Sequence, residues 1–153
     1  MNEQPVAVET EFVTFEVGGQ LFGIDVAHVH EVFRPQAISP VPLARAEIAG
    51  VMNLRGRIVT LVCARRRLGL PPAIEGSPAP MALRIERNGE SYAVLVDAVG
   101  EVLKAPGNIG EAAPSNLDPC WAAVSCGVYR LQGRLLVAWD VDRLLDLGLT
   151  AAA

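Results

Sequence analysis

The residue best placed for molecular recognition is Arg55, which stands in a charged turn between two apolar segments. The run Gly50–Gly56 leads directly into the apolar stretch Arg57–Val62. Asn53 and Gly56 permit the turn, because Asn and Gly tolerate the backbone angles of a tight reversal. An arginine held between short strands presents a planar, permanently charged fork at a fixed position. This geometry predicts recognition of a partner rather than a chemical reaction.

The residues that could support catalysis lack the arrangement that catalysis requires. A cysteine nucleophile needs a histidine base within hydrogen-bond reach and a turn that stabilises an oxyanion. Cys63 lies in an apolar run, and Cys126 lies beside Gly127. The sequence contains no Gly-x-Ser-x-Gly elbow, phosphate-binding loop, dinucleotide fingerprint or HExxH motif. We therefore expect no enzymatic activity. A small β-barrel enzyme that uses a cysteine is the alternative from a different class.

Neither the histidines nor the cysteines have the spacing of a metal site. His28 and His30 are two residues apart on a predicted helix, so they face different directions. The cysteines are odd in number and lack a CxxC pair: Cys63, Cys120 and Cys126. The sequence predicts no metal and no other cofactor. We expect the thiols to be reduced, buried and involved only in packing.

The composition indicates a folded domain. The chain has 153 residues, of which 51% are hydrophobic, which argues against disorder and suits one domain or two subdomains that share a core. The formal net charge is −4 and no long basic block is present, so nucleic acid is not an expected partner. The basic cluster Arg65–Arg67 is expected to form a solvated rim.

The two ends of the chain and the lengths of its apolar runs predict a cytoplasmic protein. Residues 1–11 are the expected flexible N-terminus, and they lack the basic start and apolar block of a secretory signal. No apolar run approaches the roughly 20 residues of a spanning helix, so direct membrane insertion is not expected. Residues 148–153 are the expected C-terminal tail, which leaves 12–147 as the folded domain.

Short apolar strands joined by tight turns account for most of the apolar residues. The first three predicted hairpins pair Val13–Val17 with Leu21–Val26, Met81–Arg87 with Ser91–Val96, and Val128–Leu131 with Leu135–Trp139. A fourth reverses at Arg55 and Gly56. The predicted structural turn residues are Gly18, Gly19, Gly56, Asn88 and Gly89. Many short strands with little helix predict an all-β fold built of barrels.

Helix is expected at only two places. Asp25 is predicted to cap a short helix over Val26–Phe33, and Asp140 or Asp142 is predicted to start a C-terminal helix. Asp97 is expected to accept hydrogen bonds from a nearby turn. Two further segments, rich in Pro and Gly, are expected to be surface loops: Pro71–Pro80 and Ala105–Pro119. No repeat of fixed period is evident.

The run Gly50–Gly56 resembles the signature of the CheW family, the coupling proteins of bacterial chemotaxis arrays, in which Gly-Val-x-Asn-Leu-Arg-Gly precedes a hydrophobic strand. The likeness extends from Phe12 to Leu147. It includes the segment Val29–Val32, similar to the family's Val-x-Glu-Ile/Val, and Asp140–Leu145, similar to its ending. The resemblance implies two intertwined SH3-like β-barrels that share one core, with a short helix after the first hairpin and a short C-terminal helix.

The resemblance also implies which residues meet each partner. Glu31 and Arg55 correspond to a Glu and an Arg near the family's receptor-facing groove, where they could form a charge-assisted pair. The full receptor-binding set is Val29, Glu31, Val32, Asn53, Leu54 and Arg55. Gly50 and Val51 are expected to meet the kinase, with Gly50 leaving room for a partner strand. The alternatives are unconnected solvated charges and simple core roles for the apolar residues.

The function that the resemblance implies is that of a non-catalytic adaptor. Such an adaptor couples the cytoplasmic tip of a methyl-accepting chemoreceptor to the regulatory domain of a CheA-type histidine kinase, in the cytoplasm at the inner membrane. The alternative within the same fold is a receptor-binding protein that does not engage the kinase and acts as an array spacer or competitor. Thr60 stands where the family commonly has Pro, which suggests a divergent member from a non-flagellar pathway.

Overall fold

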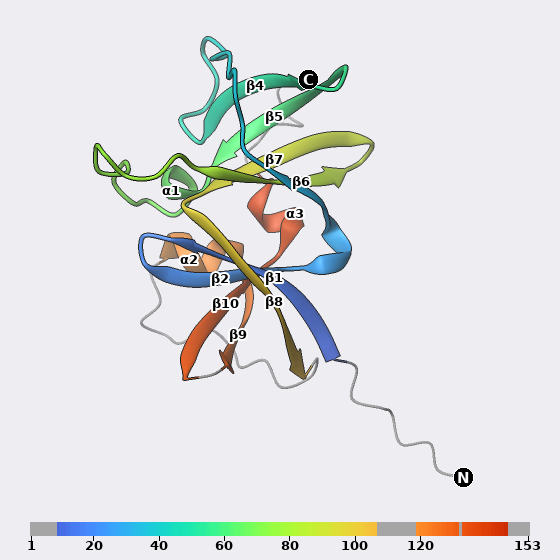
Figure 1. Ribbon diagram of the computed structural model, residues 1–153, viewed down its shortest axis with the longest axis vertical. Helices are drawn as coiled ribbons and strands as arrows, with labels where there is room; N and C mark the ends of the chain where they lie inside the picture. The colour runs from blue at the N-terminus through green and yellow to red at the C-terminus, as the bar shows by residue number, and fades with distance from the viewer. Residues whose placement is uncertain (1–8, 107–118, 132, 147–153) are drawn as a thin grey trace.

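The computed structural model describes residues 9–106, 119–131 and 133–146, which form two five-stranded sheets (Figure 1). The sheet that we call the terminal barrel has the order β8-β1-β2-β10-β9, with β1 (Glu9–Val17), β2 (Gln20–Asp25), β8 (Ala98–Pro106), β9 (Ser125–Leu131) and β10 (Arg134–Trp139). The sheet that we call the central barrel has the order β3-β6-β7-β5-β4, with β3 (Val29–Phe33), β4 (Ile48–Leu54), β5 (Arg57–Cys63), β6 (Met81–Arg87) and β7 (Glu90–Val96). The chain crosses between the sheets twice, which confirms the intertwined all-β architecture.

The two halves of the chain follow the same path. Strands β1 to β5 place a hairpin in the terminal barrel, send β3 across to the central barrel and add the hairpin β4–β5 there. Strands β6 to β10 do the same in the opposite direction, with β8 as the crossing strand. The hairpins of each barrel meet through a parallel pair, β2 beside β10 and β7 beside β5. The sequence shows no fixed period, yet the strand topology is repeated.

The predicted hairpin turns are confirmed. Both central residues have positive φ in three of them: Gly18 (61°) with Gly19 (83°), Arg55 (53°) with Gly56 (87°), and Asn88 (55°) with Gly89 (80°). This is the type I′ arrangement, whose twist matches that of the flanking strands. The remaining hairpin, predicted between Val128–Leu131 and Leu135–Trp139, pairs β9 with β10 as expected, and Gly133 has φ 78°. Local backbone chemistry thus specifies the register of these hairpins.

A shared core fills the space between the two sheets. Phe15 and Phe22 of the terminal barrel and Leu83 and Ile85 of the central barrel belong to it, and all four are fully buried. Figure 1 shows helix α3 (Val141–Leu144) lying between the sheets, where it adds apolar side chains to this core. The side chain of Asp140 accepts a hydrogen bond from the backbone N–H of Arg143 at 3.1 Å, which confirms the predicted cap of the C-terminal helix.

Each barrel also has an interior of its own. Phe12, Leu21, Leu136 and Ala138 form that of the terminal barrel. The interior of the central barrel consists of Met52, Val59, Leu61, Ala82 and Ala93, with Phe33, Ile38, Ala49, Leu54 and Leu95 packed against them. Because side chains alternate across a strand, a residue two positions from one of these lies on the same inner face.

The helix predicted over Val26–Phe33 is wrong for most of its length. Asp25 does act as a cap, accepting from the N–H of Ala27 at 2.9 Å, but it caps only a 3-10 turn, η1 (Val26–His28). The following residues form strand β3, antiparallel to β6, with a bulge between Val29 and Glu31. The bulge inserts one residue into the strand alternation, so the apolar positions acquire a spacing that resembles a helix.

The arginines expected to form a solvated rim instead connect helix α1 (Ala64–Arg67) to its surroundings. Their partners are the Asp97 carboxylate for Arg65 (2.6 and 3.0 Å), the Ala46 carbonyl for Arg66 (2.9 Å), and the Arg143 and Leu144 carbonyls for Arg67 (3.0 and 3.3 Å). Asp97 also accepts from the N–H of Gly18 at 2.8 Å, as predicted. The prediction of a solvated rim is wrong for Arg65 and Arg67, which are half-buried because their acceptors come from distant parts of the chain, whereas Arg66 is exposed.

Segment boundaries also differ from the expectations. Strand β1 begins at Glu9, so the end of the expected flexible segment 1–11 is part of a sheet, while residues 1–8 and the expected tail lie outside the described residues. Strand β8 continues to Pro106, and most of the expected loop Ala105–Pro119 lies outside the described residues. The loop Pro71–Pro80 is confirmed, and helix α2 (Pro119–Val124) was not anticipated.

Candidate functional site

One end of the central barrel, which we call its mouth, carries five charged side chains. This charged cluster consists of Glu31 on β3, Arg55 in the β4–β5 turn, Arg57 on β5, and Arg84 and Glu86 on β6. The members that lie on strands share the inner face of the barrel, because Glu31, Arg57 and Arg84 each lie two residues from an interior side chain and Glu86 lies two residues from Arg84. The pairs are Glu31 with Phe33, Arg57 with Val59, and Arg84 with Ala82.

Two arginines hold Glu31 in place. A side-chain nitrogen of Arg55 donates a hydrogen bond to Oε1 of Glu31, and Nε of Arg84 lies 3.4 Å from the same oxygen. Glu31 and Arg84 stand opposite each other in the β3–β6 register. The expected pairing of Glu31 with Arg55 is therefore present, and the alternative of two unconnected charges is wrong.

Arg84 extends this pair into a chain of alternating charges. Its Nη1 donates to Oε2 of Glu86 at 2.9 Å, and Nη1 of Arg57 lies 3.4 Å from that oxygen. The side chain of Arg84 is only 16% exposed, whereas those of Arg55 and Arg57 are 65% and 62% exposed. Sequence reasoning missed Arg57, Arg84 and Glu86, because only the register between strands brings them to the mouth.

The ion pairs keep both carboxylates of the cluster charged. The hydrogen bond from Arg55 is the main cause that lowers the pKa of Glu31, and the hydrogen bond from Arg84 is the main cause that lowers the pKa of Glu86. Glu31 in turn raises the pKa of Arg55. Glu31 and Glu86 therefore act as fixed negative charges at neutral pH.

The β4–β5 turn presents Arg55 at a conformational cost. Its φ of 53° lies in the left-handed region, which costs a residue with a Cβ roughly 1 to 2 kcal/mol. The side chain of Asn53 accepts from the N–H of Gly56 at 2.8 Å, and Leu54 packs against the barrel interior. Asn53 and Leu54 thus hold the turn that carries Arg55.

The remaining members of the expected receptor-binding set, Val29 and Val32, lie on the same face of β3, because their partners Ile85 and Leu83 are two residues apart on β6, but the two valines differ in burial. Val29 packs against the shared core, whereas Val32 is 40% exposed. The bulge between Val29 and Glu31 changes which face each residue meets. The structure brings Glu31 and Arg55 together and leaves Val32 on the adjacent surface, while Val29 and Leu54 have core roles.

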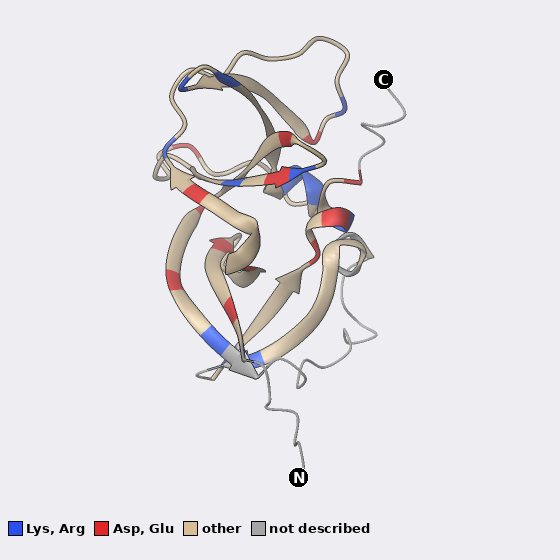
Figure 2. Ribbon diagram, turned by 90° about the vertical axis from the view of Figure 1, so that its right-hand side faces the viewer, with Lys and Arg blue, Asp and Glu red and all other residues tan. Residues whose placement is uncertain are grey.

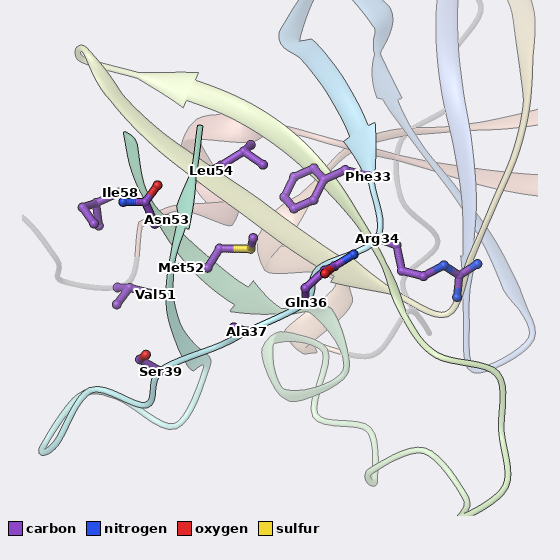
Figure 3. A pocket seen from close by; sticks show the side chains of 10 residues that line it. All are labelled: Phe33, Arg34, Gln36, Ala37, Ser39, Val51, Met52, Asn53, Leu54 and Ile58. Carbon is purple, nitrogen blue, oxygen red and sulfur yellow. The ribbon is translucent and has the colours of Figure 1, made fainter. Parts of the chain in front are cut away.

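A groove of about 580 Å³ adjoins the charged cluster on the side of β4. Figure 3 shows Phe33 of β3 and Met52 and Leu54 of β4 pointing into the same space. Val51, Asn53 and Leu54 from the expected binding sets all line this groove. Leu54 also lines a smaller hollow at the barrel mouth, so the two depressions are neighbours.

A family model of the CheW-like domain matches residues 11–148 of the chain. The chain belongs to the CheW-like family. It is 28% identical over 138 residues to the chemotaxis protein CheW of Thermotoga maritima, with 90% of this chain and 89% of that protein covered. It is 27% identical over 148 residues to the chemotaxis protein CheW of Treponema pallidum, with 93% and 87% covered. The crystal structure of the scaffolding protein TtCheW from Thermoanaerobacter tengcongensis matches with a TM-score of 0.80 and 25% identity, covering 92% of this chain and 94% of that one.

Within this CheW-like fold, Gly50 does not leave room for a partner strand, so the reason for expecting a kinase contact at Gly50 is wrong. The space beside Gly50 is filled by the chain itself: an added Cβ would collide with the carbonyl oxygen of Ser39 and lie 2.8 Å from Cγ2 of Ile38. Val51 exchanges two backbone hydrogen bonds with Ser39, at 2.8 and 2.9 Å. Gly50 is therefore needed for the closure of the central barrel by the segment that follows β3.

The predictions about cysteines and histidines have mixed outcomes. Cys63 is half-buried at the end of β5, but Cys126 is exposed, so the expectation of buried packing is wrong for Cys126, and the side chain of Cys120 lies outside the described part. His28 and His30 lie on different elements, η1 and β3. Across the described ranges, no group of three or more His, Cys, Asp or Glu residues could hold a metal ion. No described helix is long and apolar enough to cross a membrane.

Proposed function

We propose that this CheW-like chain is a non-catalytic adaptor that couples chemoreceptors to a CheA-type histidine kinase. Its relatives are chemotaxis proteins, and a matching structure is that of a scaffolding protein. The observation that carries the proposal is the exposed ion pair between Glu31 and Arg55 at the mouth of the central barrel. Exposed ion pairs contribute little to stability, and Arg55 adopts a costly backbone conformation, so contact with a partner is the better explanation of its presence.

The two partners take neighbouring surfaces of the central barrel in this proposal. The receptor tip contacts Glu31, Val32 and Arg55, while Val29, Asn53 and Leu54 support that surface from within. The regulatory domain of the kinase contacts the outer side of β4 around Val51. The adaptor then works in the cytoplasm at the inner membrane, where receptor arrays hold it, and residues 12–147 form the working domain.

The proposal is tested by reconstitution of the three-protein complex. The chain is mixed with a soluble cytoplasmic-tip fragment of a chemoreceptor and with the kinase, and kinase autophosphorylation is measured with each component omitted in turn. We expect strong activation only when all three are present. Binding to the receptor fragment without kinase activation would support the spacer alternative, and no binding to either protein would refute the adaptor function.

A further inference from the structure

Three arginines of the charged cluster surround a hollow of about 250 Å³ at the mouth of the central barrel. Arg55, Arg57 and Arg84 line it together with Leu54, Val59 and Ser91. The guanidinium groups reach it from the β4–β5 turn, from β5 and from β6. Figure 2 shows blue and red segments close to one another along the ribbon of this barrel, so basic and acidic residues are interspersed there.

The charges around the hollow do not balance. Glu31 is shared by Arg55 and Arg84, and Glu86 is shared by Arg84 and Arg57, which leaves three positive charges against two negative ones. An arginine stands at each end of the chain of charges. Arg57 is the more weakly held of the two, because its ion pair with Glu86 has a separation of 3.4 Å. The cluster therefore has one uncompensated positive charge and two exposed guanidinium groups.

Ser91 adds a further donor to the wall of the hollow. Its side chain is buried, with 8% of the residue exposed, and its hydroxyl oxygen lies 3.5 Å from Nη1 of Arg84. No acceptor for the Ser91 hydroxyl hydrogen is present within the described residues. A hydroxyl and three guanidinium groups around one hollow form a set of donors for an anionic group.

We propose that this hollow receives one carboxylate side chain of the receptor tip, held between Arg55 and Arg57. The inference rests on the adaptor function proposed above and identifies the chemistry by which that partner is bound. One carboxylate neutralises the single excess charge, and the planar guanidinium fork matches carboxylate geometry. A phosphate dianion would overcompensate this charge next to Glu31 and Glu86, so a protein carboxylate is the better fit.

The described residues at the equivalent end of the terminal barrel form a different donor set and supply a matched control. Glu16 pairs with Leu21 in the β1–β2 register as Glu86 pairs with Ser91 in the β6–β7 register. Arg134, opposite Leu131 in its hairpin as Arg57 is opposite Leu54, makes the corresponding ion pair with Glu16 at 3.3 Å. Arg134 thus has the same local setting as Arg57, but Leu21 replaces the hydroxyl.

The experiment measures the affinity of the full chain for a soluble chemoreceptor tip fragment by calorimetry at low and at moderate salt. We expect Arg57→Gln to weaken binding about tenfold and Arg134→Gln to change it by less than about twofold, with the loss shrinking as salt rises. Each acidic residue of the tip fragment is then changed to its amide. One of these substitutions should weaken binding to the wild-type chain but not to Arg57→Gln.

The outcomes separate this inference from the proposed function. If the wild-type chain does not bind the tip fragment, the adaptor function itself fails. If it binds but Arg57→Gln binds within about twofold of wild type, the carboxylate site is refuted and the adaptor function stands. The site is also refuted if no acidic tip residue is coupled to Arg57, or if inorganic phosphate at millimolar concentration displaces the fragment. Thermal melts of both variants verify that they are folded.

Discussion

The central and terminal barrels place the same ion pair at corresponding positions, Arg57 with Glu86 in one and Arg134 with Glu16 in the other. Besides the exchange of Ser91 for Leu21, their mouths differ at an inner position of the first strand of each hairpin. Arg84 occupies it in the central barrel, opposite Ala93, and Thr14 occupies it in the terminal barrel, opposite Gly23. These changes of side chain accompany two different hydrogen-bonding arrangements at the barrel ends.

The difference shows how one strand path can serve two purposes. Thr14 is 2% exposed, and its hydroxyl donates to the backbone carbonyl of Glu101 at 2.6 Å, so a side-chain hydrogen bond to the backbone joins β1 to β8 at the terminal mouth. In the central barrel the bulge in β3 leaves Glu31 directly opposite Arg84, and side-chain charges form the mouth instead. The hydrogen bond of Thr14 contributes to stability, whereas the exposed charges of the central mouth are available to a partner.

The largest expected effect comes from exchanging the two residues that distinguish the mouths. Thr14→Arg should lower the free energy of unfolding by about 3 to 5 kcal/mol, because the guanidinium would be forced against the backbone of Gly100 and Glu101 without room for its partners. Arg84→Thr should cost only about 1 to 2 kcal/mol, because Glu31 and Glu86 can reach solvent. Urea unfolding monitored by tryptophan fluorescence measures both. Wild-type stability of Thr14→Arg would show that the mouths are interchangeable.

Barrel closure provides the second test. Gly50→Ala should lower the free energy of unfolding by about 2 to 4 kcal/mol, because the new methyl group meets the backbone of Ser39. Gly89→Ala is the matched control, since Gly89 also has positive φ but has open space around it, and we expect a loss of about 1 kcal/mol. Chemical denaturation measures both losses, and the difference between them is the cost of the collision with Ser39 beyond the cost of backbone strain. Equal losses would mean that the contact with Ser39 is unimportant for the central barrel.

Reversing the charge at the exposed end of the cluster should affect coupling and leave the fold intact. Arg55→Glu places a third carboxylate beside Glu31, and we expect receptor-dependent kinase activation to fall at least about tenfold. Thermal stability should change by less than about 0.5 kcal/mol, because the side chain is exposed. Arg134→Glu at the terminal mouth is the control and should retain activation. Normal activation by Arg55→Glu would contradict the role assigned to the central mouth.

Acid titration gives the smallest expected effect. The lowered pKa values of Glu31 and Glu86 mean that their contribution to stability is fully present above their ordinary value of 4.5 and is lost as the pH falls through the lowered folded values. Burial opposes ionisation of Asp97, but hydrogen bonds from Arg65 and Gly18 outweigh it and lower that pKa too. Stability should therefore be level near neutral pH and fall below about pH 4.

Variants show which carboxylates cause the loss of stability below about pH 4. Glu31→Gln should reduce the loss of stability in acid slightly and Asp97→Asn should reduce it more, because both oxygens of Asp97 accept from Arg65, at 3.0 and 2.6 Å, and one also accepts from the N–H of Gly18. Unfolding free energies measured by urea titration between pH 3 and pH 7 are fitted for each variant. If the free energy of unfolding of Asp97→Asn falls below pH 4 as steeply as that of the wild type, the contact between α1 and Asp97 contributes nothing to stability.

The sequence by itself determined the features that depend on neighbouring residues. The turns at Gly18–Gly19, Arg55–Gly56 and Asn88–Gly89 follow from residues that tolerate positive φ, and the caps at Asp25 and Asp140 follow from side chains that accept nearby backbone hydrogen bonds. The resemblance to the CheW family led from these local elements to two intertwined barrels and to the pairing of Glu31 with Arg55.

Only the tertiary structure decided which residues meet across strands. Whether Val29–Phe33 is a helix or a strand depended on pairing with β6, and the bulge beside Glu31 hid the strand alternation from sequence reasoning. Arg57, Arg84 and Glu86 joined the charged cluster through the registers of β5, β6 and β7, which long-range hydrogen bonding sets. Gly50 changed from an expected interface residue to a closure residue because Ser39 fills the space beside it. Local propensity sets a residue's backbone conformation, but contacts between distant segments decide what its side chain touches.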